Sequence, residues 1–340
     1  MYIAGMGTIF NRGRGIESLK KSLEEGWRMP SPVYRVPVES LIDKTVLKGA
    51  RRADDVSKMA VLAAYDAFID SGLKEEAKKS LGIIVASAFG AHVTTFRFLD
   101  DVLNYGDAQV SPITFSHSVH NAAASYISST LQSRGPTLTI SQFVRSFHQA
   151  VMLAGSWLKE GRCDYILVGS VDQRGEVMEY ICRQKLRLAD DGTIRPFVFA
   201  RDPVAVPGEG SAFFVVTNQE TSKKYASISV QPDESAPEPD IYILDCDGMT
   251  GSEEEYRVIG QTRSLVASYT PIFGSMLTVS SFSCAAAAVM LKEQRYYAPP
   301  VQDNPHGLNL CAAHQYRIIN TINCVRFCCK NERLELFLKQ

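Results

Sequence analysis

Three histidines in the first half of the chain are the first candidates for acid–base chemistry. His117 and His120 lie close together, and His148 follows within a predicted helix. Histidine titrates near neutral pH, so residues of this kind can move protons in a catalytic site. Isolated histidines in such segments also serve as structural residues or interface contacts, and both interpretations stay open.

The sequence does not support a serine hydrolase or a phosphate-binding loop. Ser116 and His117 stand near Asp100 and Asp101, which are the residue types of a catalytic triad. The chain nevertheless contains no GxSxG segment, the turn that exposes the serine in α/β-hydrolases. The GEG segment at 208–210 lacks the GxGxxG or GK[ST] pattern that cradles phosphates.

The eight cysteines are expected to be free thiols. The chain is long and shows no secretion signal, which favours a reducing compartment. Cys324, Cys328 and Cys329 are not spaced like zinc ligands, so we expect neither a metal nor another cofactor. Cys284 begins a predicted alanine-rich helix whose dipole would activate a thiolate, but the sequence favours a small buried residue that packs against a neighbouring helix.

Composition and charge exclude several classes of partner. Lys and Arg total 36 against 37 Asp and Glu in 340 residues, a formal net charge of −1. Such a balanced chain gives no electrostatic reason to expect nucleic acid or an anionic membrane. No apolar run approaches the roughly 20 residues of a membrane-spanning helix, and the N-terminus does not resemble a signal peptide. We therefore expect a cytoplasmic location.

Helix-like and strand-like stretches alternate along the chain, which predicts an α/β fold. Apolar spacing predicts helices over 55–71, 92–104, 120–132, 145–160, 253–268 and 284–294. Short apolar runs predict strands over 2–9, 81–89, 137–141, 164–171, 211–218, 225–232, 239–248, 316–325 and 333–339. The alternation indicates a mostly parallel sheet, in two halves of similar layout that we place at 1–222 and 223–340. The acidic, proline-rich stretch 231–240 is either a domain boundary or a surface excursion.

Six segments along the chain match the motifs of one known protein family, in the order in which that family has them. The most specific is RPFVFARDPVAVPGEGSAFFVV. The other five, in chain order, are RRADDVSKMAVLAAYDAFIDSGL, GPTLTIS, GRCDYILVGSVD, DGMTGSEEEYRVI and FCCKN. Together they resemble the β-ketoacyl-ACP synthases of the thiolase superfamily. The segment SPITFSHSVHNAAA (111–124) is most similar to a divergent branch that includes subunits of aryl-polyene-type biosynthesis. The resemblance implies a thiolase-like fold, with two similar βα halves in a layered α/β/α/β/α architecture.

The resemblance also implies a catalytic set that this chain lacks. The family uses a cysteine at the start of a buried helix to carry the acyl chain, and two histidines to assist decarboxylation of the malonyl unit. Counted from GPTLTIS, the cysteine position falls on Val144. The histidine positions fall on Asp247 and on either Ser280 or Ser281. None of these side chains forms an acyl-enzyme or supplies an imidazole.

Other positions of the family pattern suggest binding roles. Phe115, Phe143, Val144 and Phe327 would converge on the former active site, where they either line an acyl pocket or fill the vacated space. Since segment 111–124 approaches the dimer axis in the family, it would limit the depth of a shared acyl tunnel. His117 and His120, within that segment, are candidates for the interface.

Loss of all three catalytic positions on a recognisable scaffold predicts a non-catalytic subunit. Such a chain resembles chain-length factors, which pair with an active β-ketoacyl-ACP synthase in polyketide, aryl-polyene or fatty-acid-type biosynthesis. We expect an acyl carrier protein to take part through that partner. One alternative is an active synthase or malonyl-ACP decarboxylase that uses non-standard residues such as Gln142. Another is a homodimer that binds acyl chains or a carrier protein.

Overall fold

The computed structural model describes most of the chain. The described residues are 1–28, 31, 33–199, 204–222, 224–230, 237–250, 259, 262–328 and 332–340. Most of the predicted helix at 253–268 lies outside this part, as does Cys329. Where residues 265–267 are described they form a strand, so the helix prediction is wrong there. The run Leu265–Ala267 pairs with a neighbouring strand and is half-buried to buried, a setting that suits short apolar segments.

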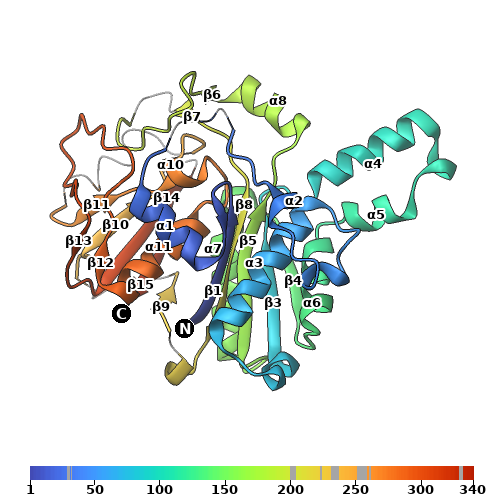
Figure 1. Ribbon diagram of the computed structural model, residues 1–340, viewed down its shortest axis with the longest axis horizontal. Helices are drawn as coiled ribbons and strands as arrows, with labels where there is room; N and C mark the ends of the chain where they lie inside the picture. The colour runs from blue at the N-terminus through green and yellow to red at the C-terminus, as the bar shows by residue number, and fades with distance from the viewer. Residues whose placement is uncertain are drawn as a thin grey trace.

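Two sets of five strands and the short strand β2, which pairs with β1, make up the main sheet (Figure 1). In the first set the order is β4-β3-β5-β8-β1, with bounds Thr137–Ile140, Leu81–Ala86, Tyr165–Asp172, Gly210–Thr217 and Tyr2–Phe10. In the second set the order is β11-β10-β14-β15-β9, with bounds Leu265–Ala267, Ile241–Leu244, Thr321–Cys328, Glu332–Lys339 and Ser227–Ser229. A single pairing, Tyr2 with Ser227, joins the sets through β1 and β9.

The two sets repeat the same pattern of strand directions. β3 is parallel to β4 and β5, as β10 is to β11 and β14. β8 runs antiparallel to β5 and β1, as β15 does to β14 and β9. Two similar halves are therefore confirmed, whereas the prediction of a mostly parallel sheet is wrong. The sequence held one signal of a reversal, because no helix is predicted between the strands at 316–325 and 333–339, and such neighbours suit an antiparallel pair.

The helices have the following bounds: α1 Gly15–Glu25, α2 Val38–Leu41, α3 Asp55–Ser71, α4 His92–Tyr105, α5 Pro112–Ser118, α6 Ala122–Leu131, α7 Ser146–Lys159, α8 Glu176–Lys185, α10 Thr270–Phe273 and α11 Ser280–Glu293. Short two-residue strands complete the set: β2 Gly13–Arg14, β6 Arg187–Leu188, β7 Val204–Ala205, β12 Arg295–Tyr296 and β13 Gln315–Tyr316. None of the helices in the described part of the chain is long and apolar enough to span a bilayer.

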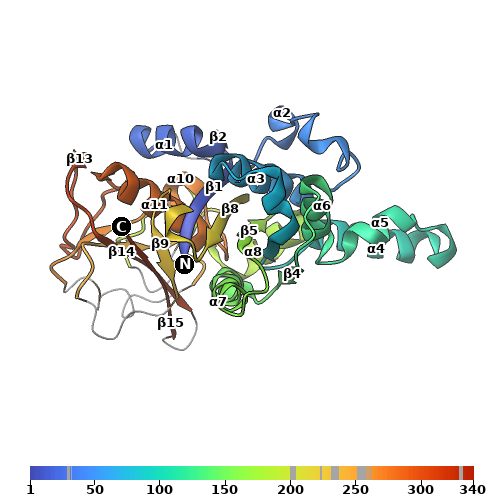
Figure 2. The ribbon, with the colours of Figure 1, turned by 90° about the horizontal axis from the view of Figure 1, so that it is seen from below.

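Close packing holds the outer helix α3 against the first half-sheet. Asp54 caps this helix by accepting a hydrogen bond from the Ser57 amide at 3.0 Å, and Gly72 ends it with φ +67°. Gly7 of β1 lets the helix backbone approach, because a Cβ there would lie 2.2 Å from the Ala63 carbonyl oxygen. Figure 2 shows α3 and α7 on opposite sides of this half-sheet.

The middle layer consists of α7 and α11, which lie between the half-sheets. α7 packs against β5 and β3 of one half and β15 and β9 of the other, while α11 packs against β14, β15 and β8. The Cys284–Leu291 stretch of α11 is fully buried, as expected of a helix that is apolar on every side. These layers agree with the architecture that the sequence predicts.

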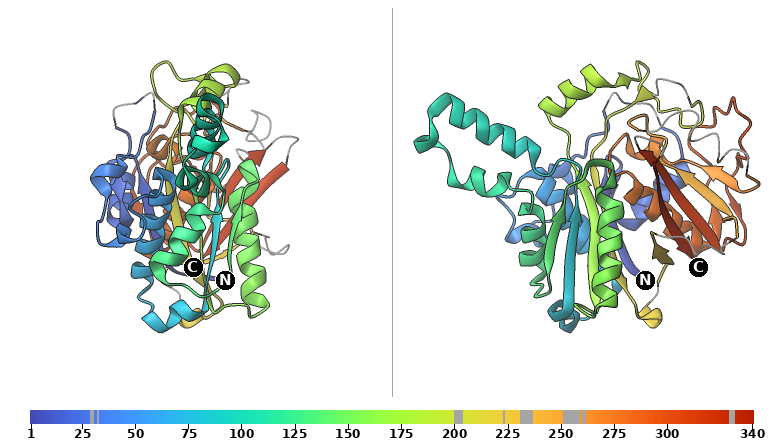
Figure 3. Two further views of the ribbon diagram at one scale, coloured as in Figure 1. Left: turned by 90° about the vertical axis from the view of Figure 1, so that its right-hand side faces the viewer. Right: turned by 180° about the vertical axis from the view of Figure 1, so that it is seen from behind.

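One pair of helices projects from the body. α4 and α5 extend away from the rest of the fold, as both views in Figure 1 and Figure 3 (right) show. Several apolar side chains on this arm, which we define as residues 92–119, are exposed: Leu99, Leu103, Tyr105, Ile113, Phe115 and Val119. Several exposed apolar side chains on one projecting pair of helices suit an interaction site.

Candidate functional site

The turn that carries Val144 is firmly held, although the residue has no reactive atom. It lies in a short 3₁₀ turn, Phe143–Arg145, directly before α7. Ser146 fixes the turn, since its Oγ accepts from the Gln142 amide at 2.8 Å and donates to the Ser87 carbonyl at 3.0 Å. Phe143 has φ +49°, a conformation that is strained for an aromatic residue. The turn thus keeps a special geometry without a nucleophile.

A buried ion network contains the predicted position of the first family histidine. Arg326 Nη2 donates to both carboxylate oxygens of Asp247, at 3.3 and 3.2 Å, and Nη1 lies 3.5 Å from Asp245 Oδ2. The amides of Met249 and Met276 donate to Asp247 at 3.1 and 3.2 Å. The three charged side chains are at most 1% exposed. Asp247 therefore acts as an ion-pair partner at the end of β10 and β14.

The predicted second histidine position lies in a network of buried hydroxyl groups. Ser280 and Ser283 both donate to the Asp245 carboxylate, the latter at 2.6 Å. Ser170 donates to Ser281 at 2.7 Å. Ser280 thus extends the ion network, whereas Ser281 links α11 to β5. These groups tie the middle layer to both half-sheets.

Burial controls the titration of this region. It raises the pKa of Asp245 and Asp247, while the positive charge of Arg326 opposes that rise. Burial, helped by Arg326, lowers the pKa of His148 to about 3. Neither ring nitrogen of His148 has a hydrogen-bond partner among the described residues. His148 is accordingly neutral at pH 7 and enclosed, which leaves it unsuited to acid–base catalysis.

The thiol candidate Cys284 is a packing residue. α11 begins at Ser280, so Cys284 lies in the second turn rather than at the helix N-terminus, where the sequence placed it. It is fully buried and contacts Cys324, whose pKa is raised well above the ordinary value by burial and by a hydrogen bond to Cys284. Both are free cysteines. Cys284 is therefore the small buried packing residue that the sequence favours, and not a thiolate activated by the helix dipole.

The predicted acyl-pocket residues occupy different environments. Phe115 is 56% exposed on α5, and Phe143 is 62% exposed on the turn before α7. Phe327 is buried in a separate cluster of the second half-sheet that includes Leu244 and Val325. The ring of Phe143 packs edge-on against Phe89, with centroids 5.7 Å apart. Two of the candidates thus lie on the surface of the single chain.

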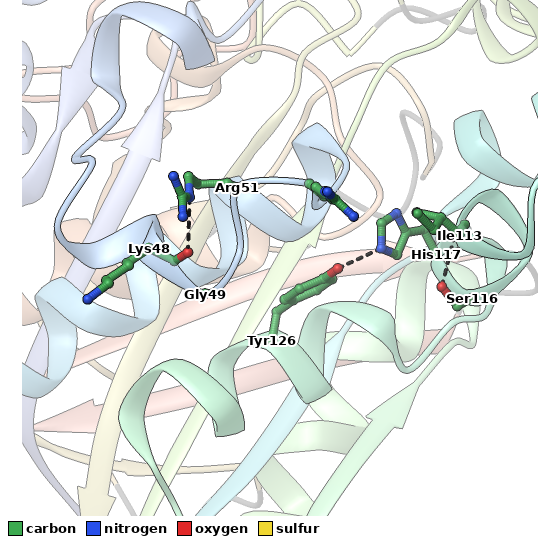
Figure 4. A pocket seen from close by; sticks show the side chains of 8 residues that line it. Lys48, Gly49, Arg51, Ile113, Ser116, His117 and Tyr126 are labelled. Atoms are coloured by element: carbon green, nitrogen blue, oxygen red, sulfur yellow. Dashed lines mark hydrogen bonds between the residues drawn. The ribbon is translucent and has the colours of Figure 1, made fainter.

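One of the two predicted interface histidines, His117, lines a basic hollow (Figure 4). His117 Nε2 is 2.6 Å from the Tyr126 hydroxyl, and the ring of His120 packs over Gly90. The hollow has a volume of about 660 Å³ and is lined by Lys48, Gly49, Arg51, Arg52, Ile113, Ser116, His117 and Tyr126. Within the described ranges, no carboxylate forms an ion pair with its lysine or arginines. The sequence offered only the adjacent Arg51 and Arg52 as a signal of this surface.

Two members of the ion network around Asp247, Arg326 and Asp245, were not predicted from the sequence. A signal for Arg326 was present, because a single arginine interrupts the apolar run INCVRFCC. A charged residue inside a buried strand requires a buried partner of opposite charge. Asp245 stands two residues before Asp247 on the predicted strand, hence on the same face.

Comparison with known proteins gives the relatives of this chain. The family described as "Beta-ketoacyl synthase, N-terminal domain" matches residues 35–222. "Nodulation protein E" of Rhizobium meliloti (strain 1021) is 26% identical over 232 residues, which cover 64% of this chain and 58% of that protein. "3-oxoacyl-[acyl-carrier-protein] synthase 2" of Mycobacterium tuberculosis (strain ATCC 25618 / H37Rv) is 22% identical over 222 residues, covering 63% and 53%. The match therefore spans less than two thirds of these relatives' lengths.

Solved structures share the whole fold. "The ishigamide ketosynthase/chain length factor" aligns with a TM-score of 0.80 and 14% identity, covering 100% of this chain and 98% of that chain. A type II polyketide synthase complex of acyl-carrier protein with its ketosynthase, AntDE:AntF, aligns with a TM-score of 0.78 and 13% identity, covering 99% and 98%. Because the family match covers more than half of the chain and the fold agrees throughout, this protein belongs to the β-ketoacyl synthase family.

Proposed function

We propose that this chain is a non-catalytic, chain-length-factor-like subunit that pairs with an active β-ketoacyl-ACP synthase. The assembly would work in polyketide, aryl-polyene or fatty-acid-type biosynthesis, in the cytoplasm, and an acyl carrier protein would deliver its substrates. We also propose that residues 1–222 and 223–340 are the two units of the chain. The solved ketosynthase/chain length factor with the same fold supports the proposed subunit role.

The observation that carries the proposal is the ion pair of Arg326 with Asp247. Condensation needs an imidazole near the acyl thioester, and Asp247, at the expected position, is instead held by Arg326 at 3.2 Å. Val144 offers no nucleophile at the start of α7. Breaking a buried ion pair of this kind is strongly destabilising. Asp247 therefore stabilises the fold and takes no part in catalysis.

Surfaces on one side of the molecule support a partner. The edge strand β4 pairs only with β3 in the described sheet, and its Leu138 is 42% exposed. The arm at 92–119 presents Leu103 at 82% exposure and Phe115 at 56%. An open strand edge beside exposed apolar groups favours a partner chain. We propose that this partner covers Phe115 and Phe143, and that an acyl chain lies between them, Val144 and Phe327.

A homodimer is the second candidate, because it would cover the same surfaces. The open edge of β4 suits a symmetric contact as well as a heterologous one. In that arrangement His117, which lines the basic hollow, and His120 would both lie near the partner. The chain would then bind an acyl group or carrier protein without an active synthase.

Co-expression with an intact Cys–His–His ketoacyl synthase from the same genome tests the proposal. The complexes are separated by size-exclusion chromatography with mass measurement and assayed for condensation of malonyl-carrier protein. We expect a one-to-one complex whose activity disappears when the partner's cysteine is replaced by alanine. Condensing or decarboxylating activity of this chain alone, or a homodimer that ignores the synthase, contradicts the proposal.

A further inference from the structure

Positive charge gathers on the surface just before α3. Lys48, Arg51 and Arg52 are all exposed, and all three line the basic hollow of about 660 Å³. His117 of α5 and Tyr126 of α6 line it as well, and Figure 4 shows Lys48 and Arg51 on one segment with these two rings on the others. The net charge of −1 for the whole chain conceals this local excess of cations.

The three cations have no counterion among the described residues. Arg51 Nε donates to the Lys48 carbonyl at 3.3 Å, and the two terminal nitrogens of this guanidinium group form no hydrogen bond to a described residue. The side chains of Lys48 and Arg52 likewise have no hydrogen-bond or ion-pair partner in the described ranges. Like charges so close along the chain repel one another, and a bound anion would relieve that repulsion.

The carboxylates closest in sequence to these cations are engaged elsewhere. Asp43 accepts from two amides of its own turn, at 2.9 and 3.2 Å. Asp54 caps α3, and Asp55 accepts from Lys58 Nζ at 3.0 Å. None of them forms an ion pair with the cations of the hollow in the described part of the chain.

The helices on the other side of the hollow contribute no carboxylate at all. α5 and α6 lie within residues 108–159, a stretch that contains neither aspartate nor glutamate. Such a stretch is long for a chain with 37 acidic residues in 340. The positive potential of the hollow is therefore not cancelled from this side, so it can concentrate an anionic ligand.

The shape of the hollow suits a small organic anion. Its volume of about 660 Å³ lies within the roughly 300–1,000 Å³ of sites that hold small molecules. His117 Nε2 lies 2.6 Å from the Tyr126 hydroxyl, which holds these two polar rings in place at its edge. Arginine binds a phosphate group through two parallel hydrogen bonds, and lysine binds it as a point charge. Several cations around one concave space therefore fit a ligand whose negative charges lie close together.

We propose that the basic hollow binds a small molecule that carries two or more phosphate groups, with Arg51 and Arg52 as its anchors. The hollow is separate from the ion network of Arg326 and Asp247 and from the turn that carries Val144. The inference does not rest on the proposed function, because the hollow would bind such a ligand whether or not the chain pairs with a synthase.

Isothermal titration calorimetry of the whole purified chain tests the site, with tripolyphosphate and ATP as probes at constant ionic strength. We expect saturable one-to-one binding, and no binding of adenosine, which lacks phosphate. Arg51→Gln and Arg52→Gln should each weaken the binding roughly tenfold, because each removes charge-assisted hydrogen bonds to phosphate. Both arginines are exposed, so each variant should keep the melting temperature of the unaltered chain.

Arg162→Gln is the matched control, because Arg162 is exposed, lies outside the hollow and pairs with nearby Glu160. It should bind both probes like the unaltered chain. Saturable binding of either probe that depends on Arg51 and Arg52 supports the site, and the two probes distinguish a free oligophosphate from one carried on an organic molecule. Equal weakening by Arg162→Gln would reduce the effect to net charge and overturn the proposal. So would a result in which neither probe binds and Arg51→Gln instead weakens a complex with an acidic partner protein.

Discussion

Arg326 Nη2 lies 3.2 Å from Asp247 Oδ2, and the two side chains are 0% and 1% exposed. The pair joins β14 to the end of β10 in the second half-sheet. The sequence predicts that Asp247 stands where the family pattern has a catalytic histidine. If it does, the position belongs to a buried ion network in this chain, and a histidine there would leave Arg326 without one of its buried partners.

Replacing Arg326 with methionine should destabilise the chain by about 3–5 kcal/mol, because Asp247 and Asp245 lose a buried cation. Urea unfolding monitored by circular dichroism measures the change. Arg162→Met, at an exposed ion pair, is the control and should cost less than about 1 kcal/mol. If both variants lose the same stability, the network has no special role in the fold.

Restoring the nucleophile alone should not restore condensation. In Val144→Cys the new thiol stands before α7, but Asp247 and Ser280 still supply no imidazole. We expect no carbon dioxide release from malonyl-carrier protein above that of the unaltered chain. The partner synthase, assayed in parallel, verifies the reagents. A clear gain in decarboxylation by the single variant would show that another group performs the work of the histidines.

Local patterns in the sequence predict the elements of this fold better than their assembly. The helix at 55–71 has the predicted bounds, because Asp54 caps it and Gly72 ends it. The strand expected at 316–325 begins only at Thr321, since residues 317–320 form no ladder. The direction of β8 and the ion pair of Arg326 depend on contacts between distant segments. Patterns within one segment can show that Arg326 needs a buried partner, but they do not show which residue that partner is, nor the direction of β8.

Exposed apolar residues of the arm should matter to assembly and not to folding. Leu103 is 82% exposed on α4, so Leu103→Asp should change the free energy of unfolding by at most about 0.5 kcal/mol. A partner that covers the arm would lose affinity, because a charge would then be buried without a counterion. Size-exclusion chromatography of the co-expressed proteins measures this. Lys48→Asp is the control, because it introduces an aspartate at an exposed residue that lines the basic hollow and lies outside the arm. Comparing the two variants separates the effect of a changed charge from the effect of a changed apolar arm. An unchanged complex with Leu103→Asp contradicts the placement of the interface.

At Phe143, in the strained turn, the glycine variant should be more stable than the alanine variant, which reverses the usual order of the two. Both substitutions remove the contact with the Phe89 ring, but only glycine adopts φ +49° without strain. Phe143→Gly should therefore be more stable than Phe143→Ala by about 1 kcal/mol. Urea unfolding of the two variants gives the difference. At exposed Leu99, within helix α4, the same pair should show the ordinary order, with alanine the more stable.

Acid should unfold this chain partly through His148. Burial lowers its pKa to about 3, below the ordinary value near 6.5, so the fold favours the neutral ring. The resulting stability is complete above pH 6.5 and is lost as the pH falls toward 3, at about 1.4 kcal/mol per pH unit. By pH 5 the loss should reach about 2 kcal/mol.

His148→Leu removes this group and, in the described residues, breaks no hydrogen bond. The difference in unfolding free energy between the unaltered chain and the variant should therefore shift by about 2 kcal/mol between pH 7.5 and pH 5, in favour of the variant at low pH. The buried aspartates titrate with the opposite sign, because their raised pKa values make stability fall as the pH rises. They are present in both proteins and cancel in the difference. Phe147→Leu, a neighbouring buried change without a titrating group, should cost the same at both pH values; a pH-dependent cost there would mean that acid loosens the packing of α7 by another route.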